Sequence, residues 1–232
     1  MTKEEMLSEL KKLSIIVNED TINKLDILAH ELVEYNKHTN LTSIIELEEI
    51  YLKHFFDSAT ITKVIDLSEI DNLIDIGTGA GFPGLIIKLL YPEVNVTLLD
   101  SNNKKIKWLE FISNKLEIKV NIVYDRVENY SKKNLNAFDV VTSRAVSNLR
   151  VLSEISLPLV KKGGYFIPLK GNVDEELKES MPTLNCMSAK LIKKETFKLY
   201  NGEGIRNVLL ITKIGETKVS SLREYDKIIK NH

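Results

Sequence analysis

The spacing of apolar residues along the chain changes character near residue 70. Before that point, apolar side chains recur every three or four positions, which is the period of one face of an amphipathic helix. This pattern predicts helices over residues 4–16, 20–37 and 46–61. In the second of them the apolar stripe consists of Ile22, Leu25, Leu28, Leu32 and Tyr35. We expect these helices to pack on a core formed by the rest of the chain, without a sheet of their own.

After residue 70, short apolar runs alternate with helical patterns. The predicted strands cover residues 72–76, 94–99, 119–123, 138–142 and 164–169. The predicted helices among them cover residues 83–90, 103–115 and 147–160. Because strands that alternate with helices at this spacing are joined by crossovers, the sequence predicts a parallel, doubly wound α/β sheet.

The end of the chain departs from this alternation. Two further predicted strands, 189–199 and 205–214, are separated only by the turn Asn201-Gly-Glu-Gly204. A link this short can join only antiparallel neighbours. We therefore expect a mostly parallel, seven-stranded sheet with an antiparallel C-terminal hairpin. In this interpretation residues 1–232 form one domain, with a helical extension over 1–65 packed on a Rossmann-like core over 70–232.

A cluster of glycines follows the first predicted strand. Four of them lie in the eight residues 77–84, at positions 77, 79, 81 and 84, shortly after Asp75. Glycine allows positive φ and lets a ligand approach the main chain, and the N-terminus of the helix that follows favours a nucleotide-like ligand. Read from Gly79, the segment fits the dinucleotide fingerprint G-x-G-x-x-G. Read from Asp75, it is similar to motif I of S-adenosylmethionine (AdoMet) methyltransferases, unless Asp75 merely caps a turn.

A second acid supports a nucleotide-like ligand without deciding between these interpretations. Asp100 closes the apolar run Val94-Asn-Val-Thr-Leu-Leu99, about 25 residues after Asp75. An acid at the end of the second strand commonly accepts hydrogen bonds from ribose hydroxyls. The alternative is that Asp100 serves only the solubility of an exposed strand end.

Composition excludes several classes of protein. Hydrophobic residues make up 43% and charged residues 28% of the 232 positions, which is ordinary for a globular protein. No apolar run approaches the ~20 residues of a membrane span. With Cys186 as the only cysteine, the chain has no internal disulfide and no cysteine-rich zinc site, and its histidines show no ligand spacing, so we expect no metal. The first residues lack the apolar region of a signal peptide, which favours a cytoplasmic protein.

Charge is divided unevenly although the net charge is only −1. Residues 1–75 carry 7 Lys/Arg and 16 Asp/Glu, whereas residues 76–232 carry 25 and 17. A basic face on the second part of the chain could approach phosphate groups, although solvated lysines are the ordinary alternative. The basic residues that could border a phosphate-binding pocket are Lys104, Lys105, Lys107, Lys132, Lys133, Arg144 and Lys170.

Several sequence blocks together resemble one family over nearly the whole chain. The blocks are Tyr35-Asn36, Asn40-Leu-Thr42, His54-Phe-Phe-Asp-Ser58, Asp75-Ile-Gly-Thr-Gly-Ala-Gly-Phe-Pro-Gly84, Leu98-Leu-Asp-Ser101, Arg126-Val-Glu128, Ser143-Arg-Ala145 and Leu169-Lys-Gly171. In this order they are similar to the bacterial small-subunit ribosomal RNA methyltransferase G family, also called glucose-inhibited division protein B. The resemblance implies a class I methyltransferase fold and methyl transfer from AdoMet to N7 of a guanine in 16S ribosomal RNA. It also implies recognition within the 30S subunit, and we expect no membrane and no stable protein partner.

The resemblance implies roles for particular residues. Gly77, Gly79 and Phe82 would lie against the methionine and adenosine parts of AdoMet, and Asp100 would bind the ribose. Val127 and Glu128 fall where the family contacts the adenine edge. The alternative for Glu128 is an ordinary surface position. The block also places His54 and Asp57 near the cofactor, where they could equally be a helix-packing pair. We expect Trp108 to pack on the sheet.

Arg144 follows the strand Phe138-Asp-Val-Val-Thr142, at the edge of the sheet where ligands of open α/β folds bind. It is our candidate catalytic residue in a positioning role, holding either the cofactor carboxylate or the target guanine, and Lys170 is a similar candidate. The alternative for Arg144 is a structural ion pair. No general base is expected, because guanine N7 carries a lone pair and no proton.

Other chemistries fit the residues less well. Thr142-Ser-Arg-Ala145 replaces the Asn/Asp-Pro-Pro-aromatic motif of many amino-directed methylases, and there is no Pro-Cys motif for C5-pyrimidine methylation. The remaining alternatives are a class I methyltransferase acting on another RNA, a protein or a small molecule, an NAD-dependent oxidoreductase, and a non-catalytic RNA-binding module.

Overall fold

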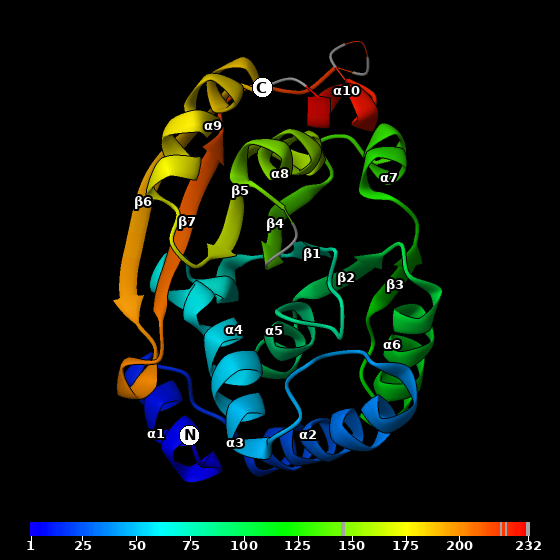
Figure 1. Ribbon diagram of the computed structural model, residues 1–232, viewed down its shortest axis with the longest axis vertical. Coiled ribbons are helices and arrows are strands. Elements are labelled where there is room, and N and C mark those ends of the chain that lie inside the picture. Colours follow the sequence, from blue (N-terminus) through cyan, green and yellow to red (C-terminus); the bar gives the residue numbers. More distant parts are fainter. Residues whose placement is uncertain (145–146, 219, 221, 231–232) are drawn as a thin grey trace.

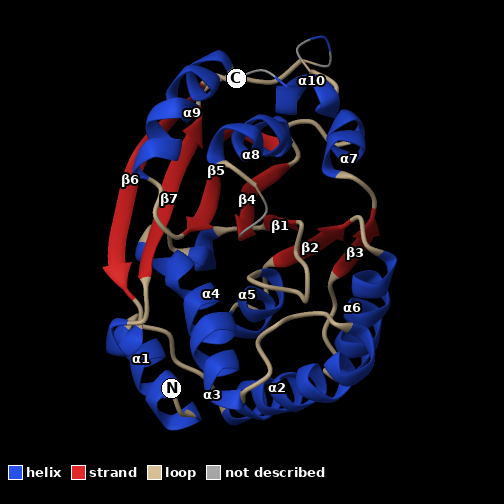
Figure 2. Ribbon diagram, in the orientation of Figure 1, coloured by secondary structure: helices blue, strands red, loops and turns tan. Residues whose placement is uncertain are grey.

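The computed structural model describes residues 1–144, 147–218, 220 and 222–230. A seven-stranded sheet crosses the molecule, and helices cover both of its faces (Figures 1 and 2). The strands are β1 (Asn72–Ile76), β2 (Asn95–Asp100), β3 (Asn121–Tyr124), β4 (Phe138–Arg144), β5 (Val160–Lys170), β6 (Ala189–Lys198) and β7 (Ile205–Lys213). Their order in the sheet is β3-β2-β1-β4-β5-β7-β6.

Strand direction confirms the predicted fold class. β1 to β5 are parallel, whereas β7 is antiparallel to both β5 and β6. β1 lies between β2 and β4, so the chain leaves the centre of the sheet in one direction and later returns to build the other half. In open α/β sheets, ligands bind outside the carboxyl ends of the strands at such a switch point. The residues that follow β1, β2 and β4 are therefore expected to form the site.

Two groups of helices cover the two faces (Figure 1). One face carries α1 (Lys3–Lys12), α2 (Glu19–Thr39), α3 (Leu47–Glu49), η1 (Ile50–Phe56), α4 (Asp57–Ala59), η2 (Thr60–Lys63), α5 (Gly84–Leu90) and α6 (Asn103–Lys115). The other face carries α7 (Val127–Lys133), α8 (Leu149–Ser156), α9 (Asp174–Cys186) and α10 (Tyr225–Lys230). The short helical turns η3 (Leu67–Glu69), η4 (Leu157–Leu159) and η5 (Tyr200–Gly202) lie in connections.

The helix predicted over 46–61 forms, but with a change of hydrogen bonding inside it. Its middle part, η1, is a π-helix that carries His54, and a 3-10 turn ends the run. Single π-helical turns occur frequently at functional sites because they change which side chains share a face. The sequence pattern gave no signal for this, since apolar periodicity does not resolve one helical hydrogen-bonding pattern from another.

Other boundaries differ from the predicted ones. The helix predicted over 147–160 ends at Ser156, and a 3-10 turn containing Pro158 leads into β5, which begins at Val160. Proline has no backbone N–H to continue the α-helical hydrogen bonds, which favours the end of the helix at this point. The helices α7, α9 and α10 were not predicted, because α7 and α10 are short and α9 contains an internal proline, Pro182.

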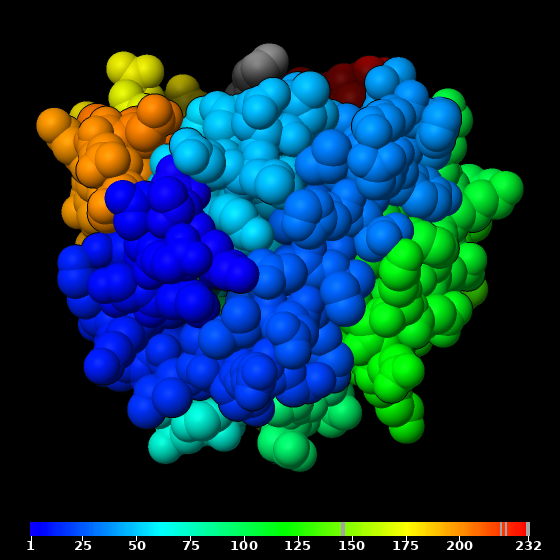
Figure 3. Space-filling model, turned by 90° about the horizontal axis from the view of Figure 1, so that it is seen from below, coloured from blue at the N-terminus to red at the C-terminus, as the bar shows by residue number. Residues whose placement is uncertain are grey.

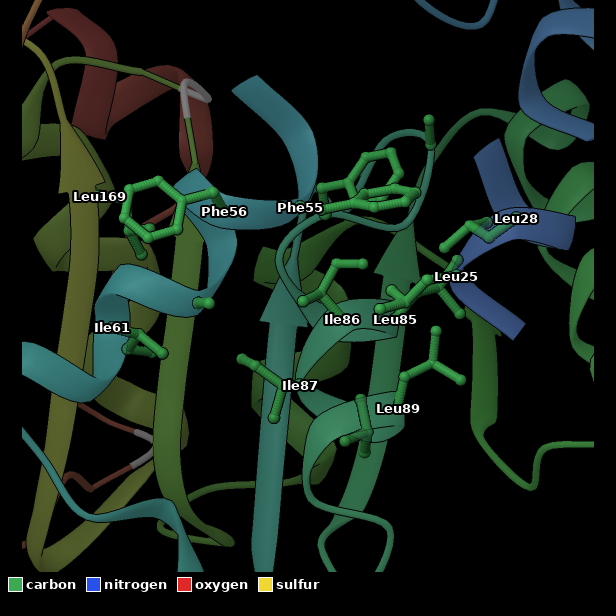
Figure 4. Close-up of a cluster of buried hydrophobic side chains, with 14 of the residues drawn as sticks. Leu25, Leu28, Phe55, Phe56, Ile61, Leu85, Ile86, Ile87, Leu89 and Leu169 are labelled. Carbon is green, nitrogen blue, oxygen red and sulfur yellow. The ribbon is translucent and has the colours of Figure 1, made fainter. Parts of the chain in front are cut away.

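The N-terminal helices share a hydrophobic core with α5 and the sheet. Leu25 and Leu28 of α2 and Phe55 of η1 point toward Leu85 and Ile86 of α5 (Figure 4), and all five side chains are at most 1% exposed. A buried side chain of this size contributes about 1.5–3 kcal/mol relative to an exposed one. The N-terminal segment covers most of the end of the molecule seen in Figure 3, beside α6. Among the described residues, no helix is long and apolar enough to cross a membrane.

Candidate active site

The turn between β1 and α5 is the first component of the site. Gly77 and Gly79 have φ of 62° and 63°, a region that residues with a Cβ rarely adopt. Gly84 is needed for a different reason, since a Cβ there would lie 2.3 Å from Leu98 Cδ2 of β2. The indole Nε1 of Trp108 donates to Ala80 O at 2.9 Å, so this fully buried ring supports the turn. Trp108 thus supports the glycine turn from within the hydrophobic cluster that it shares with residues of the sheet, in keeping with the predicted packing.

Asp75 connects the two ends of this turn through hydrogen bonds. Its Oδ2 accepts hydrogen bonds from Thr78 Oγ1 at 2.6 Å and from the Gly84 N–H at 2.9 Å. Its Oδ1 is buried without a hydrogen-bond partner among the described residues. Complete burial raises the pKa of Asp75 to about 7, against the opposing effect of its hydrogen bonds. Asp75 therefore caps the turn, and its second oxygen retains acceptor capacity.

Asp100 joins the glycine turn to the end of β2. Its Oδ2 accepts from the Gly79 N–H at 2.9 Å, and its Oδ1 accepts from the Asn102 N–H at 2.8 Å. Lys105 Nζ lies 4.0 Å from Oδ2. Each carboxylate oxygen can accept more than one hydrogen bond, so Asp100 holds the turn and can still accept from a ligand.

Two neighbouring cavities meet at Gly77 and Asp100. The first, which we call the Asp100 cavity, has a volume of about 170 Å³ and is also lined by Val127, Glu128 and Tyr225. Its other lining residues are Ile76, Leu99, Ser101, Asp125, Arg126 and Ile155. It extends from the switch point toward α7 and α8, where apolar side chains and acceptor oxygens face a common space.

The second cavity, the Phe82 cavity, has a volume of about 390 Å³. It shares Gly77 and Asp100 with the first cavity and adds Phe82, His54 and Arg144. Its remaining lining residues are Leu41, Thr42, Thr78, Gly79, Ala80 and Lys105. The residues predicted to bind a cofactor thus all line one of these two adjoining cavities.

Arg144 is held by a network that starts at the π-helix. Its Nη2 donates to His54 Nδ1 at 2.9 Å, and its Nη1 donates to Lys53 O at 2.6 Å and lies 3.4 Å from Asp57 Oδ2. Only 16% of the Arg144 side chain is exposed, and burial lowers its pKa, opposed chiefly by Asp57. The ion pair that was the alternative interpretation of Arg144 is therefore present, in addition to its place in the cavity wall.

His54 is neutral in this network. Burial, followed by the charge of Arg144, lowers the pKa of His54 to about 3. Its Nε2 lies 3.1 Å from Thr42 Oγ1, and its ring stacks on Phe82 with 4.5 Å between centroids and 10° between planes. His54 therefore connects Arg144 to the aromatic wall of the Phe82 cavity.

A third cavity, the Lys170 cavity, lies on the other side of Arg144. It has a volume of about 460 Å³ and shares His54 and Arg144 with the Phe82 cavity. Lys170 Nζ is 2.8 Å from Glu176 Oε2, and Arg206 Nε donates to Asp57 Oδ1 at 3.1 Å. The remaining lining residues are Ile44, Lys53, Leu169, Gly171 and Asn172. The Phe82 cavity thus shares lining residues with each of the other two cavities. Arg144 lines both the Phe82 cavity and the Lys170 cavity.

Comparison with known proteins gives this arrangement a family. The model of the family described as rRNA small subunit methyltransferase G matches residues 21–206. A protein of Lachnoclostridium phytofermentans named Ribosomal RNA small subunit methyltransferase G is 42% identical over 225 residues, covering 95% of this chain and 93% of its own length. A protein of the same name from Bacillus subtilis is 39% identical, covering 94% and 92%. The chain belongs to this family.

Membership of the family confirms the predicted resemblance and identifies the chain as an AdoMet-dependent methyltransferase. Solved structures agree with its fold. The structure of M. jannaschii TYW2 in complex with AdoMet has a TM-score of 0.55 at 12% identity, and the match covers 69% of this chain and 75% of that one. A putative methyltransferase from Bacillus halodurans has a TM-score of 0.54 at 14% identity and covers 68% and 99%.

The residues of the first two cavities fit this cofactor. Asp100 offers acceptor oxygens for the ribose hydroxyls, Val127 and its apolar neighbours offer a surface for the adenine, and Lys105 and Arg144 offer positive charge for the methionine carboxylate. The cofactor supplies an electrophilic methyl group on a sulfonium. The individual roles assigned to Gly77, Gly79, Phe82, Asp100, Val127, Glu128 and Arg144 remain predictions.

Sequence reasoning missed some members of the site and included others that lie apart. Arg206, Asp125 and Tyr225 were not singled out, because they come from β7, the loop after β3 and α10. Of the basic residues expected around a pocket, Lys105, Arg144 and Lys170 line these cavities. The four that do not are Lys104, Lys107, Lys132 and Lys133, which lie on exposed or partly exposed parts of α6 and α7.

Proposed function

We propose that this chain transfers the methyl group of AdoMet to N7 of a guanine in 16S ribosomal RNA, acting in the cytoplasm on the 30S subunit. The observation that carries the proposal is the shared wall of the Phe82 and Lys170 cavities, in which Arg144 and His54 belong to both. A cofactor held by the first two cavities and a base held by the third would meet at this wall.

The third cavity has the charge that a guanine in RNA requires. Four cationic side chains line it, those of Lys53, Arg144, Lys170 and Arg206. Two carboxylates, Asp57 and Glu176, pair with three of these cations and leave the lining net positive. Cations are suited to the O6 acceptor of guanine, which leaves the N7 lone pair free for the methyl group, and to the phosphates beside the base. In this proposal the guanine enters unpaired or displaced from its stack, because N7 must face the cofactor.

The side chains between the Phe82 and Lys170 cavities are not arranged for proton abstraction. His54 has a pKa of about 3, and its Nδ1 already accepts a hydrogen bond from Arg144. The carboxylate of Asp57 is held by Arg144 and Arg206. A reaction at N7 needs no base, since the attacking lone pair carries no proton, so alignment and exclusion of water are the remaining tasks of these residues.

The proposal is tested by transfer of labelled methyl from AdoMet to 30S subunits purified from cells that lack this protein, followed by nucleoside analysis of the digested RNA. We expect the label in 7-methylguanosine. Label in another nucleoside would contradict the proposed chemistry. Label on a ribosomal protein, or none on RNA despite AdoMet binding, would favour the alternative of a class I methyltransferase with another substrate.

A further inference from the structure

The C-terminal segment of residues 222–230 lies against the helices that border the Asp100 cavity (Figure 1). It lies beyond residue 206, where the match to the family model ends. The family motifs therefore assign it no role.

Charged contacts and one buried side chain fasten this segment. Arg223 Nε and Nη2 donate to the two carboxylate oxygens of Glu154 on α8, each at 2.5 Å. Arg150 Nη2, also on α8, donates to Ile228 O at 3.0 Å, and the Ile228 side chain is 3% exposed within the core of this face. A bidentate contact to the largely buried Glu154 fixes orientation as well as position.

A further ion pair ties the same segment to α7, the helix that begins with Val127 and Glu128. Lys132 Nζ lies 3.0 Å from Glu224 Oε1. Both helices that border the Asp100 cavity thus hold the segment. The contacts lie immediately before α10, at Arg223 and Glu224, and within it, at Ile228. Tyr225 is the residue between these anchors and the first residue of α10.

Tyr225 lines the Asp100 cavity itself, together with Asp100, Val127 and Glu128. The Arg126 guanidinium, which lines the same cavity, lies 5.9 Å from the centroid of the Tyr225 ring and 3.3 Å from Glu128 Oε1. An aromatic ring in the wall of such a cavity can pack on a base.

We propose that Tyr225 is a cofactor-binding residue and that the C-terminal segment forms the outer wall of the adenosine site. The proposal rests on the proposed function only in taking AdoMet as the ligand. Fastening to α7 and α8 holds the ring in place before the cofactor arrives, so little side-chain freedom is lost on binding. Arg223 acts as a positioning residue, because it orients the segment without lining this cavity.

Calorimetric titration of purified full-length variants tests this inference. Base stacking on an aromatic side chain has a free energy that corresponds to about tenfold in affinity, so Tyr225→Ala should raise the dissociation constant of AdoMet by about that factor. Tyr225→Phe should bind within about twofold of the wild type. Tyr124→Ala is the matched control, because Tyr124 is 62% exposed at the end of β3 and does not line the cavity.

Two further measurements separate a binding role from a structural one. The affinity for 5′-methylthioadenosine, which has the adenosine part and lacks the amino acid, should fall in Tyr225→Ala by the same factor as that for AdoMet. Arg223→Ala should weaken AdoMet binding, and adding Tyr225→Ala to it should weaken binding less than the product of the two single effects.

The outcomes distinguish this inference from the proposed function. Failure of the wild type to bind AdoMet would overturn the proposed function. Normal binding by the wild type and equal binding by a folded Tyr225→Ala protein would overturn the role of Tyr225. If Tyr225→Ala does not fold, Arg223→Ala decides, and unchanged affinity in that variant would also overturn the inference.

Discussion

The guanidinium of Arg144 determines which nitrogen of His54 carries the proton. A guanidinium can only donate, so His54 Nδ1, 2.9 Å from Arg144 Nη2, must be the acceptor. The proton of the neutral ring is therefore on Nε2, which can donate to Thr42 Oγ1. Because the same ring stacks on Phe82, protonation of His54 would disturb both the arginine and the wall of the cavity.

This relationship predicts a pH dependence of stability. The pKa of His54 falls from 6.5 to about 3 on folding, so the unfolded chain binds the proton first as the pH falls. The contribution of the neutral His54 ring to the free energy of unfolding is complete above pH 6.5 and is lost as the pH falls toward 3. At pH 5 the expected loss is about 2 kcal/mol.

Urea denaturation of the wild type and of His54→Gln at pH 7.5 and pH 5.0 measures this effect. The glutamine does not titrate, so the difference in unfolding free energy between the two proteins isolates His54. Between pH 7.5 and pH 5.0 the wild type should lose about 2 kcal/mol of unfolding free energy relative to His54→Gln. An unchanged difference would mean that His54 is not buried in its neutral form.

Removal of the Arg144 side chain should impair catalysis more than stability. We expect Arg144→Ala to lower the rate of methyl transfer by about tenfold or more, because the wall between the Phe82 and Lys170 cavities loses its cation. Single-turnover transfer to 30S subunits measures the rate, and circular dichroism checks folding. Lys162→Ala, an exposed change on β5, is the control. Full activity of Arg144→Ala would remove this residue from the site.

The carboxylate of Asp100 should matter mainly for the cofactor. Asp100→Asn keeps the size of the side chain and removes its charge, so we expect the dissociation constant of AdoMet to rise by about tenfold. Equilibrium titration measures it, with Asp66→Asn as an exposed control. An unchanged constant would contradict the assignment of Asp100 to the ribose.

The sequence predicted the fold well, because its information is local and repetitive. Apolar periodicity and the short Asn201–Gly204 link correctly gave the parallel sheet and its terminal hairpin. Glycines and acids at strand ends directed attention to the carboxyl edge of the sheet, because strand carboxyl ends meet there in any sheet of this kind. The switch point beside β1 emerged only from the strand order of the structure. The boundary proposed between extension and core stays a prediction, although side chains of both share one hydrophobic cluster.

Contacts between distant segments could not be predicted in this way. Arg206 meets Asp57 across 149 positions, and Arg223 meets Glu154 across 69. Neither pair has a local pattern, since a surface arginine and an arginine facing a buried carboxylate look alike in sequence. The π-helix that carries His54 was missed for another reason, since apolar periodicity does not distinguish one helical hydrogen-bonding pattern from another.

Close packing beneath the glycine turn predicts a stability difference between two glycines. A Cβ at position 84 would lie 2.3 Å from Leu98 and 3.1 Å from Asp75, whereas a Cβ at position 171 would meet nothing within 4 Å. Gly84→Ala should therefore lower the free energy of unfolding by about 1–3 kcal/mol, and Gly171→Ala should change it by less than about 0.5 kcal/mol. Equal effects in chemical denaturation would show that the turn is not tightly packed.

We predict that the two sides of Arg144 perform separate tasks, with the cofactor held on one side and the RNA base on the other. Lys170→Met keeps the apolar stem of the side chain and removes one of the four positive charges that line the Lys170 cavity. The most direct measurement compares, in this variant, the dissociation constant of AdoMet with the rate of methyl transfer to 30S subunits. We predict a dissociation constant within about twofold of the wild type and a rate lowered by about tenfold or more. A parallel loss of AdoMet affinity, or an unchanged rate of methyl transfer, would contradict the separation of cofactor and RNA base on the two sides of Arg144.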